Sequence, residues 1–289
     1  MKYCVQYKQG LKCLTEVDEI RIRLTTKHTI KDLANFLIEH KDQRCIIQVP
    51  KEYDENLAVS SEILTWLNLL TKDENVPNNF VLALIYSQES DEVLDKFYER
   101  LFNSGIPYLF LNPISDWDTL VGLAGLKPTD LYITNELGFD LQRVAEFLHK
   151  NNIQVRCIPN ICQSQWKNTH SFKTFFIRPE DVVIYEPYVD VLELYDNVNQ
   201  SIDKNVIDLY YQLYAIDKKW NDCLHMLIFN YRIEDTIHND IINRYGFHAK
   251  RIKCRKKCLK GGKCNYCDAI FQFNKRHQEV LEKINSSKL

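Results

Sequence analysis

Four cysteines near the end of the chain have the spacing of metal ligands. They are Cys254, Cys258, Cys264 and Cys267, in the pattern C-x3-C-x5-C-x2-C. Two close pairs of thiolates joined by a short loop can surround one soft metal ion. Gly261 and Gly262 lie in that loop and take positive φ at little steric cost, so the chain can turn sharply between the pairs. The motif predicts a four-cysteine metal site.

Zinc is the expected metal, because all four ligands are local and can close a structural tetrahedral site. An iron–sulfur cluster is the alternative, since four cysteines also hold such clusters. A closed site leaves no open coordination position, which catalytic zinc needs, so we expect a structural role. The other six cysteines are scattered along the chain. That pattern is typical of buried thiols in a reducing compartment and predicts a cytoplasmic protein.

Basic residues surround the four cysteines. Between Lys250 and Lys263 the chain has eight lysines and arginines and no acidic residue. Some of this charge balances the metal-bound thiolates, and the excess can form a surface that grips the phosphates of RNA or another nucleic acid. A solvated basic surface without a partner is the alternative. The predicted phosphate contacts are Lys253, Arg255, Lys256, Lys257, Lys260 and Lys263.

Size and composition indicate an ordinary soluble globular chain. It has 289 residues, 45% hydrophobic and 26% charged, with a net charge of −2, so any attraction to nucleic acid or membrane must be local. The first residues, MKYCVQYKQG, lack the apolar run of a signal peptide. No stretch is long and apolar enough to predict a transmembrane helix.

Strand signals alternate with amphipathic helices along most of the chain. The strand signals begin near residues 18, 44, 80, 106, 130, 153, 173 and 189. Residues 18–24 alternate with period two, whereas 45–49 and 80–85 are apolar runs of the kind found in buried parallel strands. The first nine residues are either a short strand or a lead-in. Helices are expected between the strands, with Thr29 capping the first and Ser115 with Asp118 capping the one near 120.

This rhythm predicts an α/β fold of the (β/α)8 TIM-like barrel type. An open Rossmann-like sheet is the weaker alternative, because no strand is followed by G-x-G-x-x-G. We expect the barrel over residues 1–219, and a C-terminal helical extension with the four-cysteine module over 220–289. An amphipathic helix with Ile270, Phe273 and Leu281 on one face is expected to end the chain.

Barrel enzymes act at the carboxyl ends of their strands, so the residues just past each predicted strand are the candidates for chemistry. Asn112, Asn135 and Asn160 follow three successive strands, and their amides suit a neutral polar ligand such as a base or sugar. Asparagine also occurs at strand ends simply because it tolerates turn geometry. The remaining candidates are Arg178, as an anion ligand, and Glu136 and Asp196, as general acid or base.

The segment 175–181 (FFIRPED), within an expected barrel followed by cysteines, resembles the U32 family of barrel proteins. That family includes collagenase-like peptidases and iron–sulfur-dependent hydroxylation or RNA-modification factors, so the resemblance implies a cluster at the four cysteines. The family's cysteine signature in mid-barrel is missing. A zinc-bearing barrel of the tRNA-guanine transglycosylase type is another analogy, with different cysteine spacing.

Two functions are compatible with these features. One is a cytoplasmic barrel enzyme acting on RNA or a nucleotide-like substrate, with the basic cysteine module holding the polynucleotide. The other is a non-catalytic binding or assembly protein that uses the barrel as a scaffold and carries a structural zinc.

Overall fold

The structure is a computed structural model of the whole chain. The residues it describes are 1–25, 27–49, 53–86, 92–112, 114, 116–133, 141–159, 177–194, 204–218, 239–254 and 264–286.

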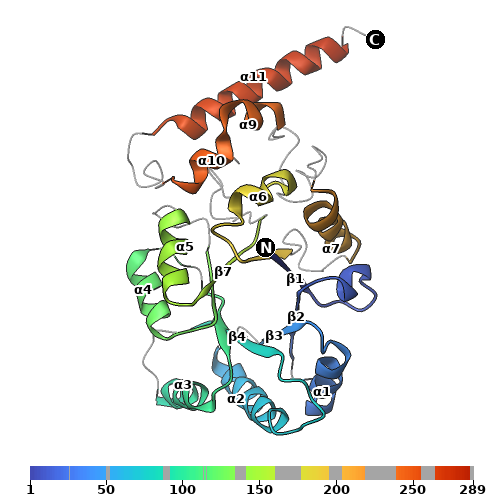
Figure 1. The fold of residues 1–289 in the computed structure, drawn as a ribbon, viewed down its shortest axis with the longest axis vertical. Helices are drawn as coiled ribbons and strands as arrows, with labels where there is room; N and C mark the ends of the chain where they lie inside the picture. The colour runs from blue at the N-terminus through green and yellow to red at the C-terminus, as the bar shows by residue number, and fades with distance from the viewer. Residues whose placement is uncertain are drawn as a thin grey trace.

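Eight parallel strands close into one barrel in chain order (Figure 1). They are β1 (Lys2–Gln6), β2 (Glu19–Arg23), β3 (Arg44–Gln48), β4 (Phe80–Leu84), β5 (Tyr108–Phe110), β6 (Asp130–Tyr132), β7 (Gln154–Cys157) and β8 (Val191–Leu194). The last strand pairs with the first in the register Lys2 to Val191 and Cys4 to Glu193. This closure confirms the predicted TIM-like barrel and rules out the open sheet.

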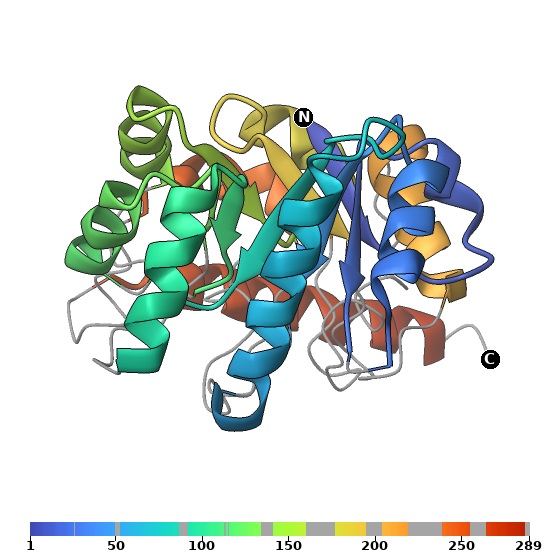
Figure 2. The same cartoon turned by 90° about the horizontal axis from the view of Figure 1, so that it is seen from below.

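Helices lie between the strands in sequence and outside them in space (Figures 1 and 2). The α-helices around the barrel are α1 (Ile30–Glu39), α2 (Tyr53–Leu70), α3 (Glu92–Ser104), α4 (Trp117–Gly125), α5 (Leu141–Lys150), α6 (Val182–Tyr185) and α7 (Lys204–Tyr211). Shorter elements are the 3-10 turns η1 (Lys12–Thr15) and η4 (Pro179–Asp181) and the π-helical η5 (Gln212–Asp217).

Three details differ from the expectation. Residues 2–6 are a strand, and this strand closes the barrel. The strand expected near 173 lies almost wholly outside the described residues; among the described strands, β7 pairs directly with β8 through Arg156 and Val191. The cap of α4 is Asp116, which accepts a hydrogen bond from the Thr119 amide, rather than the expected Ser115 and Asp118 pair.

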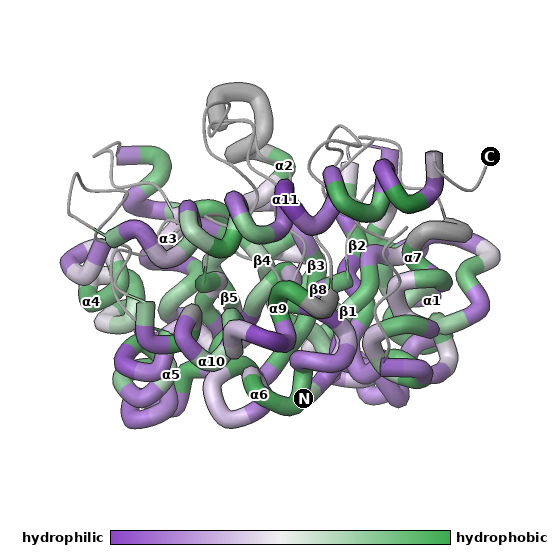
Figure 3. The backbone as a smooth tube through the Cα atoms, turned by 90° about the horizontal axis from the view of Figure 1, so that it is seen from above, coloured by the Kyte–Doolittle hydropathy of each residue, from purple (hydrophilic) through white to green (hydrophobic). Residues whose placement is uncertain are grey.

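Local sequence explains why these elements form. Thr29 and Asp32 make a reciprocal capping box at the start of α1, as a threonine followed three residues later by a carboxylate can do. Leu33, Phe36 and Leu37 are the buried stripe of that helix. The main core lies between the strands and the helices. A second, smaller cluster that includes Ile46 and Val81 lies inside the barrel. Figure 3 shows hydrophobic stretches along the central strands and helices on which hydrophobic and hydrophilic stretches alternate.

The C-terminal helices pack beside α6 at one side of the barrel (Figure 1). They are α9 (Asn239–Tyr245), α10 (Phe247–Ile252) and α11 (Tyr266–Ser286), and α9 contacts both α10 and α11. Cys267 and Ile270 are the buried side of the first turns of α11. Within the described part of the chain, no helix is long and apolar enough to cross a membrane.

Candidate active site

Charged side chains fill a large part of the barrel interior. Side chains alternate between the two faces of a strand, and on β2 the isoleucine Ile20 belongs to the outer core while Glu19 on the opposite face is fully buried. Arginines and carboxylates on five strands share this inward side. They are Glu19 and Arg21 (β2), Arg44 (β3), Asp130 (β6), Arg156 (β7) and Glu193 (β8). Three carboxylates therefore balance three guanidinium groups.

The amino end of this network is centred on Arg44. Its Nη2 lies 2.6 Å from the Asp130 carboxylate, and its Nη1 lies 3.1 Å from Glu19. Thr129 accepts a further hydrogen bond from Arg44 at 3.0 Å. Burial alone would raise the pKa of Asp130, but the hydrogen bonds and charges of Arg44, together with the charge of Arg156, lower it below its ordinary value. Asp130 is therefore an ionised, paired carboxylate.

Arg156 occupies the middle of the barrel and is fully buried. It donates a short hydrogen bond to Glu19, and its Nη2 lies 3.4 Å from Asp130. On the other side, its Nη1 lies 3.8 Å from Glu193 Oε2. Burial disfavours the charged guanidinium, but the surrounding carboxylates, Glu19 first, outweigh this effect and raise the pKa of Arg156 above its ordinary value. Arg156 thus joins the two ends of the network.

Arg21 is the end of the network that lies toward the carboxyl ends of the strands. Its Nε donates to Gln48 at 2.9 Å, and its Nη1 donates to the Tyr132 hydroxyl at 3.3 Å and, by a short bond, to Glu193. Among the described residues, none accepts a hydrogen bond from Nη2, and the side chain keeps 13% of its surface exposed. Arg21, the middle residue of β2, therefore combines a fixed guanidinium with an open donor on the side of the network nearer the carboxyl ends, where such enzymes act.

Glu193 lies directly beneath Arg21 and has no exposed surface. Burial raises the pKa of this carboxyl, and the neighbouring charges of Glu19 and Asp130 raise it further, whereas Arg21 opposes the shift. Glu193 is shielded from solvent by its position, so its direct partner at the site is Arg21 rather than a ligand.

The residues predicted at the strand ends fall into two groups. Glu136, Asp196, Asn135 and Asn160 lie outside the described residues. Asn112 is described, and its amide bonds the backbone of Tyr86 in both directions, with both distances 2.7 Å. This pairing ties the loop after β5 to the loop after β4, so the described bonds of Asn112 position the backbone.

Arg178 is buried between the barrel and the C-terminal helices. It donates a short hydrogen bond from Nε to Asp181 and a bond of 2.8 Å from Nη2 to Asn243 of α9. Asp181 also lies 3.0 Å from His248 of α10, whose Nδ1 pairs with the Tyr185 hydroxyl at 2.8 Å. These contacts join η4 and α6 to α9 and α10, and the role of Arg178 in binding substrate stays a prediction.

The cysteine module is described only in part. Cys254 and Cys264 are half-buried and Cys267 is buried in the first turn of α11, whereas Cys258 lies outside the described residues. Within the described ranges, no three cysteine, histidine or acidic side chains gather as a metal site. Of the predicted phosphate contacts, Lys253 is described and exposed; Arg255, Lys256, Lys257, Lys260 and Lys263 are not described.

Sequence reasoning did not identify the interior network. The signal for it was the run from Asp18 to Leu24, in which Glu19, Arg21 and Arg23 alternate with apolar residues. Such alternation ordinarily indicates one buried and one solvated face. Here the apolar side faces the helices, and the charged side faces the barrel interior.

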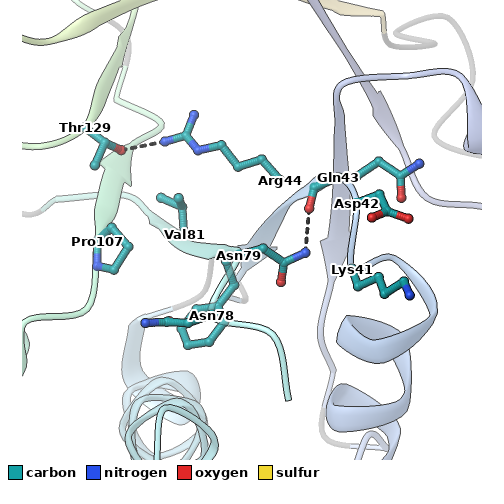
Figure 4. Close-up of a pocket in the computed structure, with 10 residues that line it drawn as sticks. Lys41, Asp42, Gln43, Arg44, Asn78, Asn79, Val81, Pro107 and Thr129 are labelled. Atoms are coloured by element: carbon teal, nitrogen blue, oxygen red, sulfur yellow. Dashed lines mark hydrogen bonds between the residues drawn. The ribbon is translucent and has the colours of Figure 1, made fainter. Parts of the chain in front are cut away.

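A cavity of about 450 Å³ opens at the amino ends of the strands (Figure 4). Its lining includes Arg44, Asn79 and Thr129, and Figure 4 shows the Arg44 guanidinium bonded to Thr129. The Asn79 amide bonds the carbonyl groups of His40 and Gln43. The amino end of a barrel contributes mainly to stability, and these lining groups are engaged in holding strands and loops together.

No protein-family model and no curated protein matches the chain. Among solved structures, a family 2 AP endonuclease from Brucella melitensis is similar at 11% identity and a TM-score of 0.43, over 74% of this chain and 98% of that one. An HpcH/HpaI aldolase from Desulfitobacterium hafniense aligns at 8% identity and a TM-score of 0.36, over 66% and 85%. A conserved Enterococcus faecalis protein of unknown function aligns at 11% identity and 0.39, over 75% and 66%. With TM-scores below 0.5, these similarities carry no argument about the activity or the fold, and the barrel is established by the strand pairing itself.

Proposed function

We propose that this protein is a TIM-barrel enzyme that binds a phosphate-bearing, nucleotide-like substrate or RNA at the carboxyl ends of its strands. The observation that carries the proposal is Arg21, whose guanidinium is fixed by Gln48, Tyr132 and Glu193 and keeps Nη2 open. A pre-positioned guanidinium matches the geometry of phosphate oxygens and loses little conformational entropy when it binds them.

Two strands of the site, with β7 between them, lead to the predicted acid–base residues. Strand β6, which carries Tyr132, ends four residues before Glu136, and strand β8, which carries Glu193, ends two residues before Asp196. We therefore keep Glu136 and Asp196 as the proposed general acid and base, and Asn112, Asn135, Asn160 and Arg178 as the proposed substrate contacts. A carboxyl near a bound phosphoryl or glycosidic group can transfer a proton to or from it.

We propose that the basic cysteine module is the part of the protein that binds the polynucleotide. The chemistry of its donor set fits zinc, because four thiolates at short spacing satisfy a tetrahedral structural site. Cys264 and Cys267 lie on either side of the start of α11, and Cys254 lies two residues after the end of α10. When bound, the metal would fix this segment and its lysines, and the lysines would contact phosphates.

Arg21→Gln tests the substrate proposal. We expect it to weaken the binding of adenosine monophosphate about 10- to 100-fold, because one charge-assisted hydrogen-bond donor set is lost. Isothermal titration calorimetry on the full chain measures the affinity. Arg100→Gln is the matched control, since Arg100 is an exposed arginine on α3, outside the barrel. Equal affinity of the wild type and Arg21→Gln, or no binding of any nucleoside monophosphate by the wild type, would reject the proposal.

Reversing charge at Lys256 and Lys257 tests the RNA grip. The double variant Lys256→Glu with Lys257→Glu is expected to lower affinity for a single-stranded RNA oligonucleotide by about tenfold or more and to flatten its salt dependence. Filter binding at several salt concentrations gives both quantities. Lys31→Glu with Lys72→Glu makes the same change of net charge at exposed sites on the barrel side. An equal loss in this control would show a general charge effect and contradict a local grip.

A further inference from the structure

Arg156 faces both groups that anchor Arg21. Its Nη1 lies 3.8 Å from Glu193 Oε2, and its guanidinium carbon lies 5.8 Å from the centre of the Tyr132 ring. Glu193 and Tyr132 are the two interior acceptors of Arg21 Nη1. The fully buried Arg156 is therefore linked to Arg21 indirectly, through Glu193 and Tyr132.

Arg156 is also one of the charged groups around Glu193. The titratable and charged groups that surround this carboxyl come from four strands: Cys4 (β1), Glu19 and Arg21 (β2), Asp130 and Tyr132 (β6) and Arg156 (β7). Glu19 and Asp130, which favour the neutral form of Glu193, are both paired with Arg156. Without Arg156, the charges of Glu19 and Asp130 would be less compensated, and Glu193 Oε2 would lose the guanidinium group 3.8 Å away.

We propose that Arg156 is a positioning residue for the Arg21 anion site: its guanidinium faces Glu193 and Tyr132 and holds both side chains where they anchor the Arg21 guanidinium. The role of Arg21 as an anion ligand rests on the proposed function. The positioning of Arg21 by Arg156 is a property of the protein without ligand, so it can be measured separately.

The experiment follows the carboxyl carbon of Glu193 by 13C NMR during a pH titration of the full chain, with Glu193→Gln identifying the signal. Arg156→Met is expected to raise the proton affinity of Glu193 about tenfold or more, because the buried carboxylate loses a cation. Arg44→Met is the matched control, since Arg44 also pairs with Glu19 and Asp130 while its described bonds do not include Glu193. An equal shift in both variants would show an effect of total interior charge and overturn the proposal.

Arg156→Lys keeps the charge and covers the case in which Arg156→Met fails to fold. Lysine lacks the planar group that lies against Tyr132, so we expect faster hydrogen exchange of the Arg21 Nε proton, with Glu193 titrating nearly as in the wild type. Unchanged exchange in Arg156→Lys, with circular dichroism showing a folded chain, would also overturn the proposal. Failure of the wild type to bind nucleotides would refute the proposed function and leave both readouts intact.

Discussion

Asp130→Ala is expected to lower the free energy of unfolding at pH 7 by about 3–5 kcal/mol, because it leaves buried charge without its partner. Asp130 is fully buried and contacts two guanidinium groups, at 2.6 Å from Arg44 and 3.4 Å from Arg156. Arg156 is fully buried and cannot reach bulk water without opening the barrel, whereas Arg44 is partly exposed at the amino-end cavity. Urea denaturation monitored by circular dichroism measures the change.

The same substitution should change how stability depends on pH. Because the folded-state pKa of Asp130 is lowered, its contribution is fully present above the unfolded pKa of about 4 and is lost as pH falls through the folded value. The wild type should therefore lose stability in acid more steeply than Asp130→Ala does. Asp42→Ala, at an exposed position beside the amino-end cavity, should leave both the stability at pH 7 and this pH dependence unchanged. Equal stability of wild type and Asp130→Ala would contradict a structural role for the network.

Purified wild-type protein is expected to hold about one zinc per chain, and Cys267→Ser is expected to lose it. A structural zinc in small modules contributes an apparent 10–16 kcal/mol, roughly, at neutral pH, so chelation should also unfold the segment that joins α10 to α11. Metal analysis and the absorption spectrum of anaerobically purified protein measure metal content and type. Limited proteolysis with and without a chelator reports on the segment.

Cys13→Ala is the control for loss of a buried thiol, because Cys13 is buried in η1 and lies far from the module in sequence. It should keep the metal. A colourless protein without zinc would refute the metal site, and a brown protein would replace zinc with an iron–sulfur cluster. Either result would leave the barrel and Arg21 as they are.

Local chemistry was sufficient to predict most of the secondary structure. The capping box at Thr29 and the buried stripe of α1 depend on residues within one or two turns of each other. The apolar run at β4 is fully buried, as its composition predicted. The cap of α4 is Asp116 rather than the predicted residues. A helix begins at the residue whose side chain accepts a hydrogen bond from the backbone amide three residues later, and several neighbouring residues here have side chains that could do so.

The sequence predicted that eight strands close the barrel, but it did not predict which eight segments these strands are. Residues 2–6 are too short and too mixed to identify alone, and they become a strand because β2 and β8 flank them. The expected strand near 173 had a comparable local pattern, yet β7 and β8 pair with each other. Pairing partners depend on the whole sheet, and local propensity does not contain that information.

By itself, the sequence determined the alternation of strands and helices, the capping of α1, and the cluster of four cysteines that lies among lysines and arginines. Only the tertiary structure decided the candidate site, because its partners are far apart along the chain. Arg21 meets Glu193 across 172 residues, and Arg156 meets Glu19 across 137. In a closed barrel both faces of a strand are buried, so charged residues that would point to solvent in an open sheet must neutralise one another inside it. That requirement brings Arg21 and Glu193 together inside the barrel.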